Sequence, residues 1–241
     1  MDPKYGERYS ELFHKHWWWR ARSDLIIEKL RELFPVAGGE TILDIGCGDG
    51  LFFERLASFG EVEGVEPGAE LVSENNPNRN QIYICPFDER FQPGKQYSLI
   101  LMLDVLEHLE DSLGALRRVE NLLKPGGKLV ATVPAFMALW TNHDVLNHHR
   151  TRYTRAALRA ITLETGLRID EERYLYHWTC PVKLGVRMVE RLLRSEPKPA
   201  RVPVRWLNEA LYRVSRFEQR TVTRLPMPFG SSLLIVATKL A

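Results

Sequence analysis

Short apolar runs alternate with amphipathic stretches along most of this 241-residue chain. Each apolar run ends near a glycine, a proline or an acidic residue, which is typical of buried strands. The predicted strands are 41–45, 61–66, 81–84, 97–103, 128–133, 167–177 and 232–239. Helical periodicity predicts helices over 8–34, 51–59, a segment that starts at Pro67, 109–123, and a segment after Thr154.

This alternation of strands and helices predicts the fold class. We expect an α/β, Rossmann-like, seven-stranded, mostly parallel sheet with helices on both faces, plus a helical insertion before the last strand. The expected parts are an N-terminal helical lid (1–37), the Rossmann-like core (38–178), a basic helical insertion (179–228) and the last strand of the core sheet (229–241). In such sheets a ligand binds at the carboxyl ends of the strands.

Composition narrows the class of protein. Hydrophobic residues make up 44% of the chain, charged residues 27%, and the formal net charge is +2, all ordinary for a globular domain. This balance argues against nucleic acid as the main partner. The three cysteines show no CxxC spacing, and neither a signal peptide nor an uncharged membrane span is visible, so we expect a cytoplasmic protein.

Positive charge is concentrated in one segment. Residues 181–224 contain 11 Lys and Arg against 4 Asp and Glu, whereas the rest of the chain is net acidic. Helical periodicity there gives one apolar stripe in 181–195 (Val182, Val186, Val189, Leu193) and another in 204–224 (Trp206, Leu207, Leu211, Val214, Phe217), which we expect to face inward. The expected arrangement is a two-helix cover with its charged face in solvent.

A membrane gives the alternative interpretation of 181–224. A basic amphipathic helix can lie on an anionic membrane surface, and peripheral contact there would make the acceptor a lipid or a lipid-linked sugar.

A glycine loop follows the first predicted strand, in the run LDIGCGDG at 43–50. Its spacing is GxGxG, and Leu51 stands where a dinucleotide-binding fingerprint requires its last glycine, which argues against NAD. Glu66, at the end of the second strand, is placed to accept hydrogen bonds from both hydroxyls of a ribose.

Together with GVEP (64–67), LMLDVLEHLED (101–111) and LLKPGGKLVATVP (122–134), this loop resembles the ordered motifs of class I S-adenosylmethionine (SAM)-dependent methyltransferases. The resemblance covers about residues 40–170 and the last strand. It implies methyl transfer from SAM by in-line displacement, with S-adenosylhomocysteine as the product. By motif, the implied cofactor-binding residues are Asp44, Gly46, Gly48, Gly50, Glu66, Phe87, Asp88, Leu103 and Asp104. Pro67 departs from the pattern by removing one backbone N–H next to the ribose.

The N-terminal run HKHWWWRAR (14–22) carries three consecutive tryptophans, which cannot all face one side of a helix. Related methyltransferases often place such a helix over the cofactor as a lid. We hypothesise that Arg22, or less favourably Arg20, binds the carboxylate of the methionine moiety. The alternative is a surface arginine beside a tryptophan anchor.

A histidine-rich loop, 134–152, follows the fifth strand and should overhang the substrate. His148 or His149, and then His143, are the candidate general bases for a hydroxyl acceptor, because histidine titrates near neutral pH. Tyr153 is a further candidate in reach of the site. The alternative is that Asp144 and the imidazoles only hydrogen-bond the loop to itself.

Metal ligands form a second alternative in this region. Asp104, Glu107 and His108 stand at i, i+3 and i+4, and with His148 or His149 they would offer oxygen and nitrogen ligands. Some methyltransferases that act on hydroxyls show a similar arrangement with a divalent ion, but most members with this run bind none. We therefore expect no metal.

These patterns favour methyl transfer to an oxygen of a small-molecule, saccharide or lipid-linked acceptor. The run after the fourth strand lacks the Asn-Pro-Pro-Tyr signature of amino-group methylation. Two alternatives remain: an NAD-dependent oxidoreductase, and a SAM-binding or S-adenosylhomocysteine-binding regulatory or membrane-associated module without catalysis.

Overall fold

A seven-stranded sheet forms the centre of the computed structural model, which describes residues 3–36, 38–194, 196–222 and 225–240. The strand order is β3-β2-β1-β4-β5-β7-β6, and all pairs are parallel except those of β7 with β5 and β6. The strands are β1 (Glu40–Ile45), β2 (Gly60–Glu66), β3 (Ile82–Ile84), β4 (Tyr97–Leu103), β5 (Leu123–Pro134), β6 (Arg168–Leu175) and β7 (Ser232–Thr238). The predicted fold class is confirmed.

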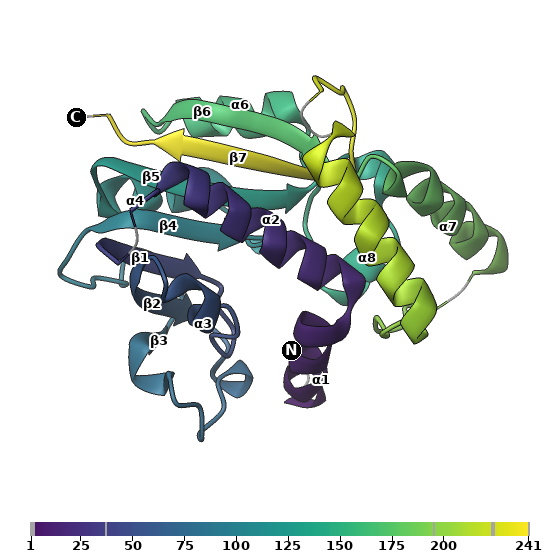
Figure 1. Ribbon diagram of the computed structural model, residues 1–241, viewed down its shortest axis with the longest axis horizontal. Coiled ribbons are helices and arrows are strands. Elements are labelled where there is room, and N and C mark those ends of the chain that lie inside the picture. The colour runs from purple at the N-terminus through teal and green to yellow at the C-terminus, as the bar shows by residue number, and fades with distance from the viewer. Residues whose placement is uncertain (1–2, 37, 195, 223–224, 241) are drawn as a thin grey trace.

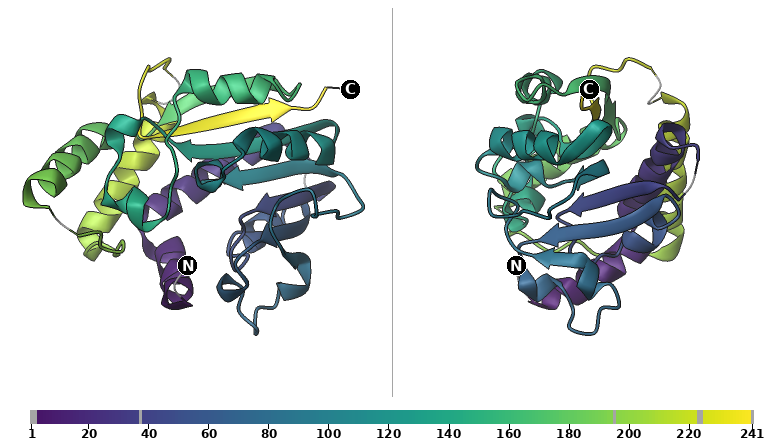
Figure 2. Two further views of the ribbon diagram at one scale, coloured as in Figure 1. Left: turned by 180° about the vertical axis from the view of Figure 1, so that it is seen from behind. Right: turned by 90° about the vertical axis from the view of Figure 1, so that its left-hand side faces the viewer.

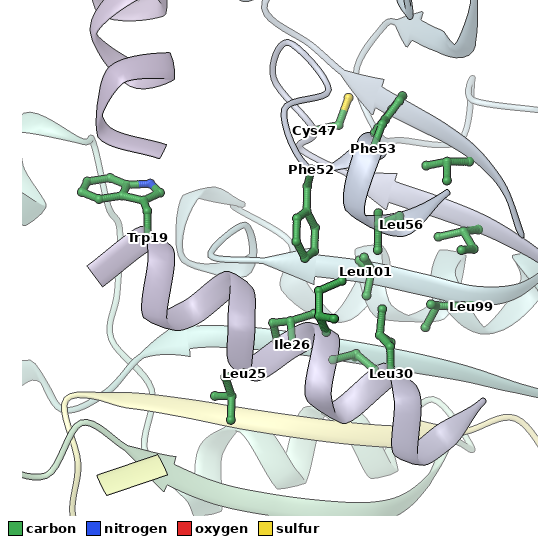
Figure 3. Packing of buried hydrophobic residues seen from close by; sticks show 14 of the residues in the cluster. Trp19, Leu25, Ile26, Leu30, Cys47, Phe52, Phe53, Leu56, Leu99 and Leu101 are labelled. Carbon is green, nitrogen blue, oxygen red and sulfur yellow. The ribbon is translucent and has the colours of Figure 1, made fainter. Parts of the chain in front are cut away.

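Helices cover both faces of this sheet, because its central strands are apolar on both sides (Figures 1 and 2). On one face α2 (Trp17–Leu33) and α3 (Phe53–Leu56) pack on the sheet, and on the other face lie α4 (Ser112–Leu122) and α6 (Arg155–Leu163). Ile26 and Leu30 of α2 point toward Leu99 and Leu101 of β4 (Figure 3). This packing fixes α2, which carries Arg22, against the sheet.

The N-terminal helix differs from its prediction. In place of one helix over 8–34, α1 (Pro3–Lys15) and α2 are separated at His16, whose backbone is extended. The His16 imidazole accepts a hydrogen bond from the N–H of Trp18 at 3.2 Å and so caps α2. The break lets α1 turn toward the glycine loop, where Tyr9 and Phe13 face the same cavity as Arg22.

Two other predicted helices are shorter in the structure. The 51–59 segment is helical only in α3, and Pro67 is followed by a single 3-10 turn, η1 (Ala69–Leu71). The remaining short elements are η2 (Arg79–Gln81), η3 (Leu106–His108), η4 (Met137–Leu139) and α5 (Asn142–Leu146). These turns are too short to bury an apolar stripe, so irregular chain forms most of the connections at the carboxyl ends of the strands.

The insertion contains α7 (Thr179–Leu193) and α8 (Arg205–Arg220), at the end of the sheet to which β4 and β5 point (Figure 1). The prediction that the apolar residues of the second helix face inward is wrong: Trp206, Leu207, Val214 and Phe217 are exposed, and Leu211 is only partly buried. The apolar stripe of α7 is likewise exposed. Arg187 and Glu190 of α7 instead contact η4 and α5, so the expectation that the charged side of the cover lies in solvent is wrong for these two residues. Among the described residues, no helix combines the length and apolarity needed to span a bilayer.

Candidate functional site

The glycine loop after β1 is shaped by backbone that only glycine adopts easily. Gly46 has a φ of +72°, and a Cβ added there would lie 2.8 Å from Cγ2 of Val105. Cys47 in the same loop is buried against Gly64 of β2, where a Cβ would lie 2.4 Å from its Sγ. Burial, and then the carboxylates of Asp44 and Glu66, raise the pKa of the Cys47 thiol, so this cysteine is a packed filler and not a nucleophile.

Glu66 is fixed by the loop at the end of β2. One of its oxygens accepts a hydrogen bond from the N–H of Gly48 at 3.0 Å, and the other accepts one from the N–H of Gly68 at 2.9 Å. Burial raises the pKa of Glu66, while these two backbone donors lower it. Gly68 thus supplies a donor one residue after Pro67, which has none. The carboxylate is oriented with lone pairs left for a ligand.

Arg22 and Asp44 meet in a small cavity in front of the glycine loop. Arg22, Asp44, Gly46 and Leu103 line this cavity together with Tyr9, Phe13, Ser23, Cys47, Leu51 and Phe52. The Arg22 guanidinium donates to the carboxylate of Asp104 and lies 4.9 Å from the centre of the Trp18 ring. Burial raises the pKa of Asp44 to about 7, although the charge of Arg22 opposes this. The cavity therefore presents one buried cation between two acids.

The other residues implied by the resemblance lie around this cavity or beside it. Gly48 and Gly50 continue the same loop with positive φ, and Asp104 follows β4 with a φ of 59°. Phe87 and Asp88 do not line the cavity. The Phe87 ring packs 5.8 Å from that of Phe91, and Asp88 accepts from Arg90 at the surface. The roles of these residues stay predictions.

Sequence reasoning missed two sets of neighbours of the cavity. Tyr9 and Phe13, four residues apart on α1, line it, and this helical spacing was the available signal. Tyr176 is fully buried after β6 with a φ of 57°, and its ring lies 6.1 Å from that of Trp18, which in turn contacts the Arg22 guanidinium. No motif marks Tyr176, because only the fold brings the end of β6 near α2.

The histidine-rich loop is organised around Asp144, which is completely buried. Its carboxylate accepts from Nε and Nη2 of Arg152 at 2.8 and 2.9 Å, and from the N–H of Thr141 at 2.8 Å. Nδ1 of His149 donates to the same carboxylate at 2.8 Å. Although burial acts to raise the pKa of Asp144, the bonds from His149 and Arg152 hold it far below its ordinary value. Asp144 is therefore a permanent anion that orients His149.

Only one of the three predicted histidine bases lies in the interior of the loop. His149 is partly buried, with Nδ1 on Asp144 and its ring 4.8 Å from that of His108. His148 is exposed and has a φ of 56°, and His143 is also exposed on α5. The hydroxyl of Tyr153 contacts Ser112 and the carbonyl of Leu106 at 2.7 and 3.1 Å. The loop does hydrogen-bond to itself, and it holds His149 in one orientation by doing so.

Three side chains that could hold a metal ion, one of them His149, lie close together. One ligand atom each of Glu107, His108 and His149 lies within 4.8 Å of the other two. Glu107 is fully buried, and neither carboxylate oxygen has a hydrogen-bond partner in the part of the chain described. Burial, and then the neighbouring His149, lower the pKa of His108 to about 4, which keeps it neutral as a ligand must be. Asp104, the fourth predicted member, is not part of the group and pairs with Arg22.

Comparison with known proteins assigns a family to this geometry. A family description of the methyltransferase domain matches residues 18–172, well over half of the chain. The chain belongs to the class I SAM-dependent methyltransferases. The matched region contains most of α2 with Arg22, the glycine loop, Glu66 and the histidine-rich loop, whereas Tyr9 and Phe13, which also line the cavity, lie outside it.

The curated relatives share part of their length with this chain. A ubiquinone biosynthesis O-methyltransferase of Bradyrhizobium diazoefficiens is 32% identical over 101 residues, which are 39% of this chain and 40% of the relative. A protein of the same name from Burkholderia ambifaria is 27% identical over 179 residues, 66% of this chain and 69% of the relative.

Solved structures share the fold. A SAM-dependent methyltransferase from Archaeoglobus fulgidus superimposes with a TM-score of 0.57 at 21% identity, covering 90% of this chain and 94% of the other. Phosphoethanolamine N-methyltransferase 2 of Haemonchus contortus, solved in complex with SAM, gives a TM-score of 0.56 at 17% identity, covering 88% of this chain and 51% of the other.

Proposed function

We propose that this methyltransferase transfers a methyl group from SAM to an oxygen of a small-molecule, saccharide or lipid-linked acceptor. The observation that carries the proposal is the buried arrangement of Glu66 on the glycine loop beside the cavity that Arg22 and Asp44 line. A ribose and an amino-acid moiety need this combination of a fixed carboxylate, a buried cation and a close backbone approach. The relatives named as O-methyltransferases support oxygen as the acceptor atom.

The residues of the chain divide the work of binding and alignment. Glu66 accepts from the ribose hydroxyls, and Arg22 pairs with the carboxylate of the methionine moiety. When bound, SAM supplies an electrophilic methyl group on a sulfonium, so no covalent enzyme intermediate is required. Helices α1 and α2 cover the cavity and exclude water from it, and holding the reactants in line lowers the barrier by several kcal/mol.

His149 is the general base that the geometry favours. Asp144 holds its Nδ1 proton, which leaves Nε2 with a lone pair to accept a proton from an acceptor hydroxyl. In the part of the chain that the structure describes, no carboxylate hydrogen-bonds to His148 or His143, and both are exposed.

Replacing His149 tests this assignment. We expect His149→Asn to lower kcat for methyl transfer by about 10²- to 10⁴-fold, with little change in affinity for S-adenosylhomocysteine. His148→Asn is the matched control, one residue away, and should keep near-normal kcat. Equal activity of the two variants would contradict His149 as the base.

The surroundings of Glu107 indicate a second way to activate the acceptor hydroxyl, with a bound cation. A buried carboxylate without a hydrogen-bond donor is stabilised either by a proton, which the raised pKa of Glu107 allows, or by a cation. Two histidines and one glutamate are a ligand set that suits Zn²⁺ and related ions. A cation there would lower the pKa of a bound hydroxyl.

Calorimetry with Zn²⁺ and Mn²⁺, after dialysis against EDTA, decides between proton and cation. If the cation is bound, Glu107→Gln should weaken its binding at least about tenfold, and Glu110→Gln, on an exposed neighbour, should not. Full methyl transfer after EDTA treatment, with no heat of metal binding, would leave His149 as the only activating group.

Titration with S-adenosylhomocysteine, using NAD⁺ as the control ligand, tests the proposed function. Binding of S-adenosylhomocysteine alone, followed by methyl transfer to hydroxylated acceptors, is expected. Binding of NAD⁺ would instead favour an oxidoreductase. Binding of S-adenosylhomocysteine without transfer to any acceptor, and with no effect of His149→Asn, would favour the regulatory module.

A further inference from the structure

Both helices of the insertion turn their polar sides to the protein and their apolar sides to solvent. The buried residues of α8 are all polar: Asn208, Ser215, Arg216, Glu218 and Gln219. On the opposite side Trp206 is 73% exposed and Phe217 is 68% exposed. This is the reverse of the usual arrangement, in which the apolar stripe of a helix packs on the core.

Specific hydrogen bonds hold α8 in this orientation. Asn208 accepts from the N–H of Trp17 at 2.8 Å and donates to the carbonyl of Lys15 at 2.7 Å, at the break between α1 and α2. Glu218 accepts from the backbone N–H groups of His177 and Trp178 at 3.0 and 3.1 Å. These backbone groups have no helix or sheet partner, so turning α8 over would leave them unsatisfied.

Helix α7 is oriented in the same way. Arg187 donates to the carbonyl of Met137 in η4 at 2.6 Å, and Glu190 accepts from the N–H of Asn142 in α5 at 3.0 Å. On its other side the stripe Val182, Val186, Val189 and Leu193 is exposed. Figures 1 and 2 show α7 standing away from the sheet.

The exposed apolar residues are concentrated in one segment of the chain. Of the twenty large apolar side chains that are exposed in the described chain, fourteen lie between Val182 and Phe229. A monomeric protein rarely exposes an apolar area of this kind unless it contacts a partner or a membrane. We use the name outer α7/α8 surface for seven of these exposed side chains: Val182, Val186, Val189, Leu193, Trp206, Val214 and Phe217.

Positive charge surrounds this surface. Arg213 and Arg220 stand four residues before and three after Phe217, on the same side of α8. These two arginines pair with Glu209 and Glu28, whereas Arg191, Arg201 and Arg205 are exposed and form no ion pair with another described residue. A tryptophan with exposed arginines beside an apolar stripe has the composition of a helix that lies at a membrane interface.

We propose that the outer α7/α8 surface docks on an anionic lipid membrane. Its apolar stripes would enter the boundary between headgroups and acyl chains, while the arginines contact lipid phosphates. A second copy of this chain fits less well, because a symmetric dimer places the same patch of both subunits together. Each patch lies in a segment with 11 basic and 4 acidic residues, so the two would repel.

The outer α7/α8 surface belongs to two helices whose inner sides contact elements of the candidate site. The inner side of α7 contacts η4 and α5, next to His149, and the inner side of α8 contacts α2, which carries Arg22. Docking would therefore place the histidine-rich loop near the lipid headgroups, where a lipid-linked acceptor would present its hydroxyl. The inference of a lipid-linked acceptor rests on the proposed function, whereas the inference of membrane docking does not.

Co-sedimentation with vesicles tests the docking. The full-length protein should pellet with vesicles of phosphatidylcholine containing about 30% phosphatidylglycerol, and at least about tenfold less with phosphatidylcholine alone. Raising NaCl from about 50 mM to about 300 mM should weaken the binding. Protein that stays in the supernatant with the anionic vesicles at low salt would overturn the proposal.

Two exposed substitutions locate the contact. Phe217→Glu and Leu193→Glu should each weaken vesicle binding at least about tenfold, because a carboxylate replaces an inserted apolar side chain. The matched control is Leu163→Glu on α6, which is also exposed but lies outside the surface and should bind as the parent protein does. Equal binding of all three variants would also overturn the proposal.

Three further measurements separate the other outcomes. Affinity for S-adenosylhomocysteine and the unfolding midpoint should stay unchanged in all three variants, which shows that they fold. Light scattering reports the oligomeric state without lipid. A dimer that Phe217→Glu dissociates, combined with no vesicle binding, would show that the surface is an interface between copies. Vesicle binding without any binding of S-adenosylhomocysteine would support the docking and reject the proposed function.

Discussion

At the scale of single residues, the centre of the site combines one buried cation with two acids. Arg22 donates to Asp104, and its charge opposes the rise in the pKa of Asp44 that burial causes. Buried charges are stable only when they are paired, so this cluster is sensitive to the loss of any member. An anionic group that enters the cavity meets a guanidinium already fixed by Asp104 and the Trp18 ring.

Arg22→Ala should therefore weaken binding of S-adenosylhomocysteine at least about tenfold, because the cation is lost and two acids are left facing the ligand carboxylate. Calorimetric titration measures this change. Arg20→Ala is the control two residues away, where the side chain pairs with Glu209 at the surface. An unchanged dissociation constant in Arg22→Ala would reject the assigned role.

Asp44 predicts a pH dependence of stability in the protein without ligand. Its pKa is about 7 in the folded protein and near 3.8 in an unfolded chain. Between pH 3.8 and pH 7 the carboxyl group therefore keeps its proton in the folded state and loses it in the unfolded state. The free energy of unfolding is thus highest, as far as Asp44 contributes to it, below the unfolded pKa, and this contribution is lost as pH rises through the folded pKa of about 7. We expect Asp44→Asn to raise the free energy of unfolding more at pH ~8 than at pH ~5, by at least about 1 kcal/mol.

Thermal unfolding across this pH range measures the effect. Asp88→Asn is a useful contrast, because the hydrogen bond from Arg90 lowers the pKa of Asp88 and the sign of its pH dependence is opposite. A midpoint difference for Asp44→Asn that does not change with pH would contradict the raised pKa.

At the scale of elements, a helix is predicted more easily than its orientation. The periodicity of 204–224 predicted α8, but it could not show that the break at His16 leaves backbone groups of Lys15 and Trp17 for Asn208 to satisfy. The same limit applies to His149, whose role depends on Asp144 and Arg152 being buried together. The glycine loop, by contrast, was predictable, because its φ angles are required by local geometry.

The α8 contact predicts a loss of stability on truncation. Asn208→Ala removes both hydrogen bonds to the partly buried α1–α2 junction, from the N–H of Trp17 and to the carbonyl of Lys15, which should cost about 1–3 kcal/mol. Chemical denaturation measures the loss. Arg205→Ala, on an exposed neighbour, should change the free energy of unfolding by less than about 0.5 kcal/mol. Similar losses in both variants would show that α8 does not depend on Asn208.

At the scale of the whole molecule, the seven-stranded, mostly parallel sheet was predictable and the surface was not. Alternating strands and helices suffice to indicate the sheet with its late last strand, because short connections and right-handed crossovers leave few arrangements. Which helix faces are covered depends on contacts between segments far apart in sequence, such as Arg216 of α8 with Glu28 of α2. Average hydropathy contains no information of that kind.

The antiparallel β7 has a consequence for how this protein can change. The chain leaves the sheet at Leu175 and returns at Ser232, and these two residues are paired neighbours across β6 and β7. Everything between them is topologically a single hairpin loop, grown to hold two helices. Such a loop can lengthen, shorten or be exchanged while every strand keeps its register. The region that meets the surroundings can therefore diverge quickly, while the region that binds the cofactor stays the same.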